Sequence, residues 1–278
     1  MFNLKFSCQK LGIIPFMKTI TSIKKSKGLA PLTVITAYDA LFASLFDAKV
    51  DIILVGDSLN MSFNAKADTL SATMDIMIYH TQAVCAGAKE TFIVMDMPFG
   101  SYTNETLALQ NASRVYAQTG AHAVKIEGGI SRAPIIRALT QNSIAVMGHI
   151  GLMPQFVRSE GGYKIRGRTE EEIQALIKDA QAVEAAGAFS LVIEGVVEEA
   201  TKRISEAISI PTIGIGAGKY TDGQVLVWSD MLGFFKPFQP KFAKRYLNGA
   251  ALVEEALDTY IKEVQTRSFP SLEYTYTK

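Results

Sequence analysis

Eight short runs of apolar and β-branched residues recur along the chain, and they constrain its fold more than any other feature. Most runs are continuous rather than alternating with polar residues, which is typical of parallel strands covered on both faces. Most of the stretches between them have helical periodicity. The runs are LTVITA (32–37), DIILVGD (51–57), TFIVMDMP (91–98), AVKIEGG (123–129), SIAVMGHIG (143–151), FSLVIEGV (189–196), PTIGIGAG (211–218) and GQVLVWSD (223–230).

Eight strands with helices between most of them predict one (β/α)8 TIM barrel, and the length of 278 residues suits that fold. The weak point is the connection between the seventh and eighth runs, where only residues 219–222 intervene. Either the seventh helix is reduced to a turn or one of the two runs is miscounted. A doubly wound open sheet is the alternative fold. We expect residues 17–278 to form a single catalytic domain with a C-terminal helix over 248–265.

Composition argues against several classes of partner. The formal net charge of +1 does not favour binding to nucleic acid or to a membrane surface. No run reaches the roughly 18 consecutive apolar residues of a membrane span. The two cysteines, Cys8 and Cys85, form neither a disulfide framework nor a metal-binding CxxC pair. We interpret residues 1–16 as an N-terminal extension rather than a targeting signal, because their apolar stretch is short and interrupted. These features predict a cytoplasmic protein.

Polar and ionisable side chains stand at the C-terminal ends of five successive strand runs. In a (β/α)8 barrel these ends meet at one mouth, where the chemistry is placed. Each residue alone could be a turn cap or half of an internal salt bridge, but five successive strands that end in this way are hard to explain by caps. The predicted site is formed by Asp57, Ser58, Asp96, Lys125, Glu127, His149 and Glu194.

Three carboxylates, Asp57, Asp96 and Glu127, predict an oxygen-rich metal site. Oxygen ligands without cysteine favour Mg²⁺ over Zn²⁺, and Mg²⁺ is commonly completed by water and by substrate oxygens. A chelating 2-oxo acid fits such a site, with Lys125 available to pair with the substrate carboxylate. Glu194 then remains for proton transfer.

Three weaker features leave alternatives open. His149 is either a secondary site residue or a satisfied structural histidine. The sequence GIGAG (214–218) either packs tightly or binds an anion through its backbone, and its spacing favours packing. The long basic loop 152–169 is either a mobile lid that receives an anionic ligand or a solvated surface loop.

Specific sequence blocks follow one another through the chain. They are DIILVGDSLNM, YHTQAV, DMPFGSY, NASRVYAQTGAHAVKIEGG, GHIGLMPQ, GGYKIRGRT, IPTIGIGAG, GQVLVWSDMLGF and PKFAKRY. Together they resemble the ketopantoate hydroxymethyltransferase family. The match extends from about Thr19 to about Glu263, which is nearly the whole chain.

The resemblance implies a barrel of the phosphoenolpyruvate mutase and isocitrate lyase type. It implies a hydroxymethyltransferase that moves a hydroxymethyl group from the co-substrate 5,10-methylenetetrahydrofolate to 3-methyl-2-oxobutanoate. The product would be 2-dehydropantoate, in the first step of pantothenate biosynthesis on the way to coenzyme A. The resemblance also implies one Mg²⁺ per subunit and a ring-like homo-oligomer, commonly a decamer.

By motif position, the resemblance implies a role for most of the predicted site. Asp57 and Asp96 would be Mg²⁺ ligands, and Glu127 would bind the metal directly or through water. Glu194 would be the proton acceptor. The oxo acid would contact Asp57, Ser58, Asp96 and Lys125.

The chain departs from the family pattern in two places. Asn60 stands where a glycine typically follows GDSL, and FNAKADTLSAT (63–73) replaces a GHDST-like block. EGVV (194–197) stands where ECVP is common. The first departure leaves the loop after the second strand open, and the second leaves open the local shape around Glu194.

Two rival functions use the same barrel. One is a Mg²⁺-dependent C–C or P–C lyase that acts on a 2-oxo acid. Such lyases tend to carry a reactive cysteine in a barrel loop, whereas neither Cys8 nor Cys85 ends a strand here. The other is a non-catalytic sensor or scaffold, which predicts a broken constellation. The ionisable residues of the constellation are all present.

Overall fold

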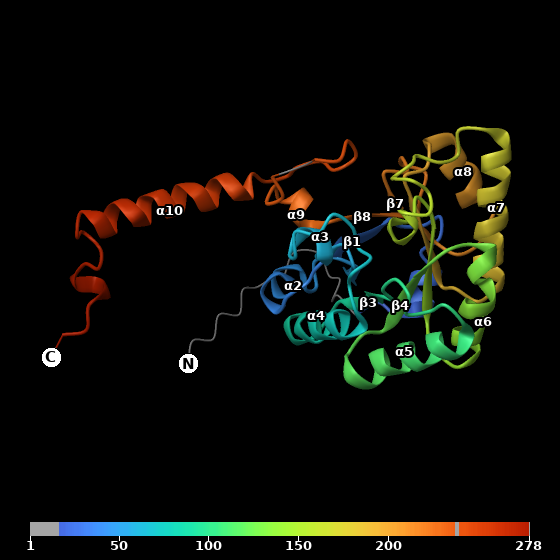
Figure 1. Ribbon diagram of the computed structural model, residues 1–278, viewed down its shortest axis with the longest axis horizontal. Coiled ribbons are helices and arrows are strands. Elements are labelled where there is room, and N and C mark those ends of the chain that lie inside the picture. The colour runs from blue at the N-terminus through green and yellow to red at the C-terminus, as the bar shows by residue number, and fades with distance from the viewer. Residues whose placement is uncertain (1–16, 237–238, 278) are drawn as a thin grey trace.

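The eight predicted runs all form strands, and the strands close into a parallel barrel in chain order (Figure 1). They are β1 (Leu32–Thr36), β2 (Ile52–Val55), β3 (Phe92–Asp96), β4 (Ala123–Glu127), β5 (Val146–Gly151), β6 (Ser190–Glu194), β7 (Thr212–Ile215) and β8 (Gly223–Leu226). The alternative of an open sheet is wrong, because β1 pairs with β8 as well as with β2. The computed structural model describes residues 17–236 and 239–277. The predicted extension, residues 1–16, lies outside the described residues.

Helices follow most of the strands and cover the outside of the barrel (Figure 1). They are α1 (Ile20–Lys24), α2 (Ala40–Phe46), α3 (Leu59–Ser62), α4 (Met74–Gly87), α5 (Glu105–Gln118), α6 (Ala133–Gln141), α7 (Glu170–Ala185), α8 (Glu198–Glu206), α9 (Trp228–Met231) and α10 (Gly249–Gln265), with 3₁₀ turns η1 (Ile130–Arg132), η2 (Pro154–Phe156) and η3 (Leu272–Tyr274). Thr169 caps α7, because its side chain accepts a hydrogen bond from the backbone N–H of Glu172. Within the described ranges, no helix has the length and apolarity needed to cross a membrane.

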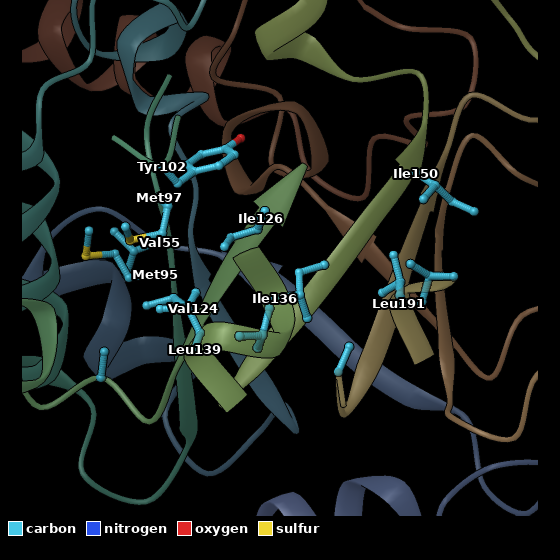
Figure 2. Close-up of a cluster of buried hydrophobic side chains, with 14 of the residues drawn as sticks. Val55, Met95, Met97, Tyr102, Val124, Ile126, Ile136, Leu139, Ile150 and Leu191 are labelled. Atoms are coloured by element: carbon cyan, nitrogen blue, oxygen red, sulfur yellow. The ribbon is translucent and has the colours of Figure 1, made fainter. Parts of the chain in front are cut away.

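Successive side chains of each strand point alternately into the barrel and out toward the helices. The inward side chains near the strand starts form one apolar cluster, which on β2 and β3 consists of Ile52, Leu54, Phe92 and Val94. The outward side chains pack against the helices in a second cluster. Figure 2 shows this second cluster, with side chains of β4 and α6 side by side, namely Val124, Ile126, Ile136 and Leu139.

The connection between β7 and β8 explains the weak point of the sequence pattern. The described chain has no helix there, so the seventh helix is reduced to a short return segment, residues 216–222. This segment lies close against β7, because a Cβ on Gly214 would lie 2.8 Å from Thr221 Oγ1. Gly216 and Gly218 turn the chain with φ values of +60° and +75°. The packing interpretation of GIGAG is therefore confirmed.

The two terminal helices are placed differently. Ile23 of α1 is fully buried and belongs to the inner apolar cluster, so α1 packs into the barrel core. The predicted C-terminal helix is confirmed as α10, but it extends away from the barrel (Figure 1, red). Every residue from 251 to 277 is exposed. The buried charged residues lie at the mouth of the barrel, where the C-terminal ends of the strands meet.

Candidate active site

The strand register places the predicted ionisable residues in the barrel mouth. Asp96 is two residues beyond inward-facing Val94, so it continues the inner face of β3 after the apolar layers end. In the same way Lys125 and Glu127 follow Ala123 on β4. Pairing between strands sets Asp96 beside Lys125 and Glu127 beside His149. The residues therefore meet because the alternation of each strand and the barrel register agree.

Lys125 lies at the centre of a buried cluster of charges. Its Nζ is 3.3 Å from Asp96 Oδ1 and 3.6 Å from Glu127 Oε1. It also lies 3.1 Å from His149 Nδ1, and His149 Nε2 is 3.3 Å from Glu194 Oε2. Residues from β3, β4, β5 and β6 thus form one continuous polar network.

Asp57 joins this network from the segment that follows β2, and Ser58 lies next to it in the chain. The backbone N–H of Asp57 donates to Asp96 Oδ2 at 3.1 Å, and Asp57 is 3% exposed. Ser58 Oγ is 2.8 Å from the hydroxyl of buried Tyr38. Burial raises the pKa of Tyr38 to about 12, so its hydroxyl stays protonated. The structure therefore brings together all seven residues of the predicted site.

The carboxylates outnumber the cations that face them. Burial raises the pKa of Asp57 well above its usual value, and the charges of Asp96 and Glu127 raise it further. Burial also raises the pKa of Asp96, whereas Lys125 and His149 hold the pKa of Glu127 below its usual value despite burial. Burial opposes the charge of Lys125, but the carboxylates outweigh burial and raise its pKa. The site therefore favours a further cation.

His149 can interact with its neighbours in two ways. Burial and Lys125 oppose its protonation, but the neighbouring carboxylates of Glu127 and Glu194 outweigh them and raise its pKa to about 9. The 3.1 Å contact with Lys125 instead needs an unprotonated Nδ1, because the ammonium is a donor only. Protonation at Nδ1 and the Lys125 contact therefore exclude one another. In the form that keeps the contact, the Nε2 proton faces Glu194.

The donor set fits a magnesium ion that keeps part of its water shell. Asp96 Oδ1 and Glu127 Oε1 are buried and accept no hydrogen bond from any residue that the structure describes. Over the same residues, no three histidine, cysteine or carboxylate side chains form a ready-made metal cage. Mg²⁺ is usually held by one or two carboxylates with water and substrate oxygens, so it does not require such a cage. Together with burial, the negative charges of Asp96 and Glu127 help to raise the pKa of Asp57, and a bound divalent cation would offset this repulsion.

Two buried residues at the site were not among the sequence predictions. Gln155 in η2 is 4% exposed, and its Nε2 donates to Asp57 Oδ2 at 2.8 Å. Tyr102 is equally buried and donates a short hydrogen bond to Gln155 Oε1. Both belong to the quoted blocks GHIGLMPQ and DMPFGSY. The family resemblance of those blocks could have pointed to both residues. The rule used to predict the site could not, because neither residue ends a strand.

Asn60, part of the first departure from the family pattern, is a buried residue that holds the following loop. Asn60 is 1% exposed, and its Nδ2 donates to the carbonyl of Asp68 at 3.1 Å and to Ser71 Oγ at 2.8 Å. Its Oδ1 accepts from Asn64 Nδ2 at 3.2 Å. Asn60 therefore pins the loop that replaces the GHDST-like block.

The basic loop 152–169 is connected to this Asn60-pinned loop. Arg158 Nη2 lies 3.0 Å from Asp68 Oδ2, and the Tyr163 hydroxyl lies 4.0 Å from Met61 Sδ. Burial raises the pKa of Tyr163, and the nearby charges of Asp68 and Glu194 raise it further. Arg166 pairs with Val196, two residues beyond Glu194, so the loop also contacts the segment after β6. Its interpretation as a lid remains a prediction.

The second departure, around Glu194, involves a close contact between strand ends. The backbone N–H of Leu152 donates to the carbonyl oxygen of Glu194 at 2.8 Å, so the loop after β5 holds the end of β6. Gly195 takes a φ of +56°, and Val196 is buried. The EGVV sequence therefore keeps the Glu194 side chain in the mouth.

The fold and the mouth define a class of barrel protein. Solved structures of similar fold include phosphonopyruvate hydrolase, with a TM-score of 0.61 and 14% identity over 94% of this chain and 92% of that one. They also include 2,3-dimethylmalate lyase, a member of the phosphoenolpyruvate mutase/isocitrate lyase superfamily. Its TM-score is 0.56 and its identity 15%, over 93% of this chain and 91% of that one. The chain therefore shares the barrel fold of these proteins.

The sequence comparisons define the family within that class. A family model for ketopantoate hydroxymethyltransferase matches residues 17–272. A 3-methyl-2-oxobutanoate hydroxymethyltransferase of Aliarcobacter butzleri is 64% identical over 92% of this chain and 96% of its own length. One of Helicobacter pylori is 54% identical over 91% of this chain and 94% of its own length. The chain belongs to the ketopantoate hydroxymethyltransferase family and is a transferase. The lyase alternative is supported only by proteins that share the fold, such as 2,3-dimethylmalate lyase at 15% identity.

Proposed function

We propose that this enzyme transfers a hydroxymethyl group from 5,10-methylenetetrahydrofolate to 3-methyl-2-oxobutanoate, which gives 2-dehydropantoate for pantothenate biosynthesis. The family membership and the names of the relatives support the substrate. The observation that carries the proposal is the buried mouth, where four carboxylates face one lysine and one histidine. Such a site suits an anionic 2-oxo acid together with a divalent cation.

The metal would be one Mg²⁺ per subunit, held by Asp57 and Asp96, with Glu127 binding it directly or through water. When bound, Mg²⁺ supplies Lewis-acid polarisation of the oxo acid's carbonyl group. The unsatisfied oxygens of Asp96 and Glu127 and the raised pKa of Asp57 support this assignment. Fixed, buried carboxylates would also orient the substrate without reorganisation during the reaction.

The oxo acid would contact Asp57, Ser58, Asp96 and Lys125. The Lys125 ammonium is buried and stays charged, so it can pair with the substrate carboxylate. The Ser58 hydroxyl is oriented by Tyr38 and can donate to a substrate oxygen. These contacts would place C3 of the substrate toward β6.

Glu194 would accept the proton from C3 of the oxo acid. Its side chain is 19% exposed, whereas those of Asp96 and Glu127 are almost fully buried, so Glu194 can both reach substrate and exchange its proton with water. His149, 3.3 Å away, holds the carboxylate in place. The one-carbon unit would be attacked as an iminium on one folate nitrogen, after its bond to the other nitrogen has opened, and the enolate carbon would bond to it. Water would then replace the remaining folate nitrogen, which leaves as the amine of tetrahydrofolate, and supply the hydroxyl group.

An assay for product tests the overall function. The protein is incubated with 3-methyl-2-oxobutanoate and methylenetetrahydrofolate, with Mg²⁺ or with EDTA, and 2-dehydropantoate is measured by mass spectrometry. We expect product with Mg²⁺ and little with EDTA. Failure to form product under either condition would contradict the proposed function, and undiminished product with EDTA would contradict the metal requirement.

Exchange of the C3 proton in D₂O tests the role of Glu194 directly. Replacing Glu194 with Gln keeps the size of the side chain but removes the base, so exchange should fall by about 100-fold or more. Glu199→Gln, at an exposed position of α8, is the matched control and should exchange like the parent. Near-normal exchange in Glu194→Gln would assign the proton transfer to another group.

We also propose that the enzyme works in the cytoplasm as a homo-oligomer. The exposed apolar residues of α10 support self-association. The proposed reaction needs only small-molecule partners, and neither nucleic acid nor a membrane has a role in it.

A further inference from the structure

We propose that Gln155 is a positioning residue that fixes two carboxylates of the mouth, Asp57 and Glu127, before metal and substrate bind. This inference rests on the proposed metal site and adds to it a residue outside the predicted ligand set. Gln155 is 4% exposed and belongs to the loop after β5, so it reaches the other two residues across the barrel mouth.

The orientation of the Gln155 amide is fixed by its partners. Nε2 donates to Asp57 Oδ2 at 2.8 Å and to the carbonyl oxygen of Met97 at 2.9 Å, and both partners can only accept when Asp57 is ionised. Oε1 accepts from the Tyr102 hydroxyl. A flipped amide would set oxygen against two acceptors and leave the Tyr102 proton facing an NH₂ group. Only one orientation satisfies all three contacts.

The backbone of the same residue holds the second carboxylate. The N–H of Gln155 donates to Glu127 Oε2 at 3.0 Å. Pro154 precedes it in η2, and the proline ring restricts the local backbone. Gln155 thus donates hydrogen bonds to one oxygen of each carboxylate, Asp57 Oδ2 and Glu127 Oε2. The second oxygen of Glu127, Oε1, accepts no hydrogen bond from the described residues and lies 3.6 Å from Lys125 Nζ.

Tyr102 is itself held from behind. Its ring lies 5.9 Å from the guanidinium carbon of Arg132, which is also 5.8 Å from the ring of Phe156. The Arg132 side chain passes over Gly128, where a Cβ would lie only 2.4 Å from its Cγ. Packing against Arg132 therefore holds Tyr102 in place. Tyr102 in turn orients the amide of Gln155, which donates to Asp57. Figure 2 shows the Tyr102 hydroxyl pointing away from the apolar cluster.

The expected consequence is an effect on metal affinity that is separate from the effect on folding. Partners that orient metal ligands typically contribute about 10- to 100-fold in affinity. Gln155→Met keeps the length of the side chain and the backbone N–H but removes the amide. We expect it to weaken Mn²⁺ binding by about 10-fold or more. The loss of activity at low metal should be largely recovered at saturating Mn²⁺.

Mn²⁺ binding to the full chain, measured by electron paramagnetic resonance, tests the proposal without relying on activity. Gln82→Met is the matched control, because the Gln82 amide also donates to a carbonyl, that of Gln118, but far from the mouth. Thermal unfolding in EDTA reports on folding alone. Gln155→Met should bind Mn²⁺ weakly while remaining folded, and Gln82→Met should bind like the parent.

A second variant keeps the test decisive if Gln155→Met does not fold. Tyr102→Phe removes only the hydroxyl that orients the amide, and it should weaken Mn²⁺ binding by several-fold. Parent-like affinity in Gln155→Met, or in Tyr102→Phe if that variant alone folds, would overturn the positioning role while leaving the metal site intact. Failure of the parent itself to bind Mn²⁺ would overturn both the metal site and the inference.

Discussion

At the scale of single residues, the mouth depends on a glycine that no other residue can replace without strain. Gly151, the last residue of β5, has a φ of +97°. A Cβ there would lie 2.3 Å from the carbonyl oxygen of Glu194 and 2.7 Å from Val196 Cγ2. The close approach lets the ends of β5 and β6 lie together, and these strands carry His149 and Glu194.

Gly151→Ala is therefore expected to be strongly destabilising. Backbone strain and the overlap with the Glu194 carbonyl should together lower the free energy of unfolding by about 3 kcal/mol or more. Gly161→Ala is the control, because Gly161 also has a positive φ but has open space around its Cβ position. That variant should cost about 1 kcal/mol. Urea unfolding measures both, and equal losses would show that the Glu194 contact has no energetic weight.

How much of the site the sequence reveals also depends on single residues. Asp96 and Glu127 could be predicted because a charged residue within an apolar strand stands out against its neighbours. Gln155 could not be predicted in this way. It lies in an irregular loop, and its contact with Asp57 spans 98 positions, which no local pattern encodes. Asn60 differs, because its partners Asn64, Asp68 and Ser71 are near in sequence and its departure from the family pattern marked the position, but an irregular loop has no periodicity that would predict which side chains meet.

At the scale of secondary structure elements, the eight strands could be predicted because strands buried on both faces are continuously apolar. The return between β7 and β8 could not, because it has neither helical nor strand periodicity. Asp222 holds it in place. Its side chain accepts hydrogen bonds from the backbone N–H groups of Thr212 and Gly28, and Lys27 Nζ lies 2.9 Å away. One carboxylate therefore connects the segment after α1 to β7 and to the start of β8.

Asp222→Asn is expected to destabilise the barrel in a pH-dependent way. Burial alone would raise the pKa of Asp222, but hydrogen bonds from Thr212, Lys27 and Gly28 outweigh it and lower the pKa. A lowered pKa in the folded state stabilises the protein above the usual value of 3.8, and this contribution is lost as the pH falls through the folded-state pKa. At pH 7 the variant should lose about 1–3 kcal/mol.

Urea unfolding between pH 3 and pH 7 checks this expectation. The difference between parent and Asp222→Asn should be constant above pH 5 and should shrink at the acid end. Asp258→Asn, at an exposed position of α10, provides the control and should follow the parent at every pH. A difference that stays constant down to pH 3 would show that Asp222 acts through packing and not through its charge.

At the scale of the whole molecule, the helix α10 lies apart from the apolar core of the barrel. The barrel buries its apolar residues in an inner and an outer cluster. The helix α10 contacts little of its own barrel and exposes large apolar side chains (Figure 1). They are Leu252, Val253, Leu257, Tyr260, Ile261 and Val264. Their spacing places them on one broad face of the helix, and apolar surface of this extent is typical of protein interfaces.

The apolar face of α10 leads to a prediction about assembly. If this face is covered by other copies of the chain, the parent should have a mass that is a multiple of 30.3 kDa. Leu257→Glu sets a charge in the middle of the face, where burial without a partner is costly, and should shift the protein toward the monomer. Asp258→Lys changes charge beside it on the polar face and should leave the mass unchanged.

Light scattering after size-exclusion chromatography measures the mass of the parent and of both variants. A monomeric parent would mean that α10 has no self-association to disrupt. An unchanged mass in Leu257→Glu would place the interface elsewhere on the barrel.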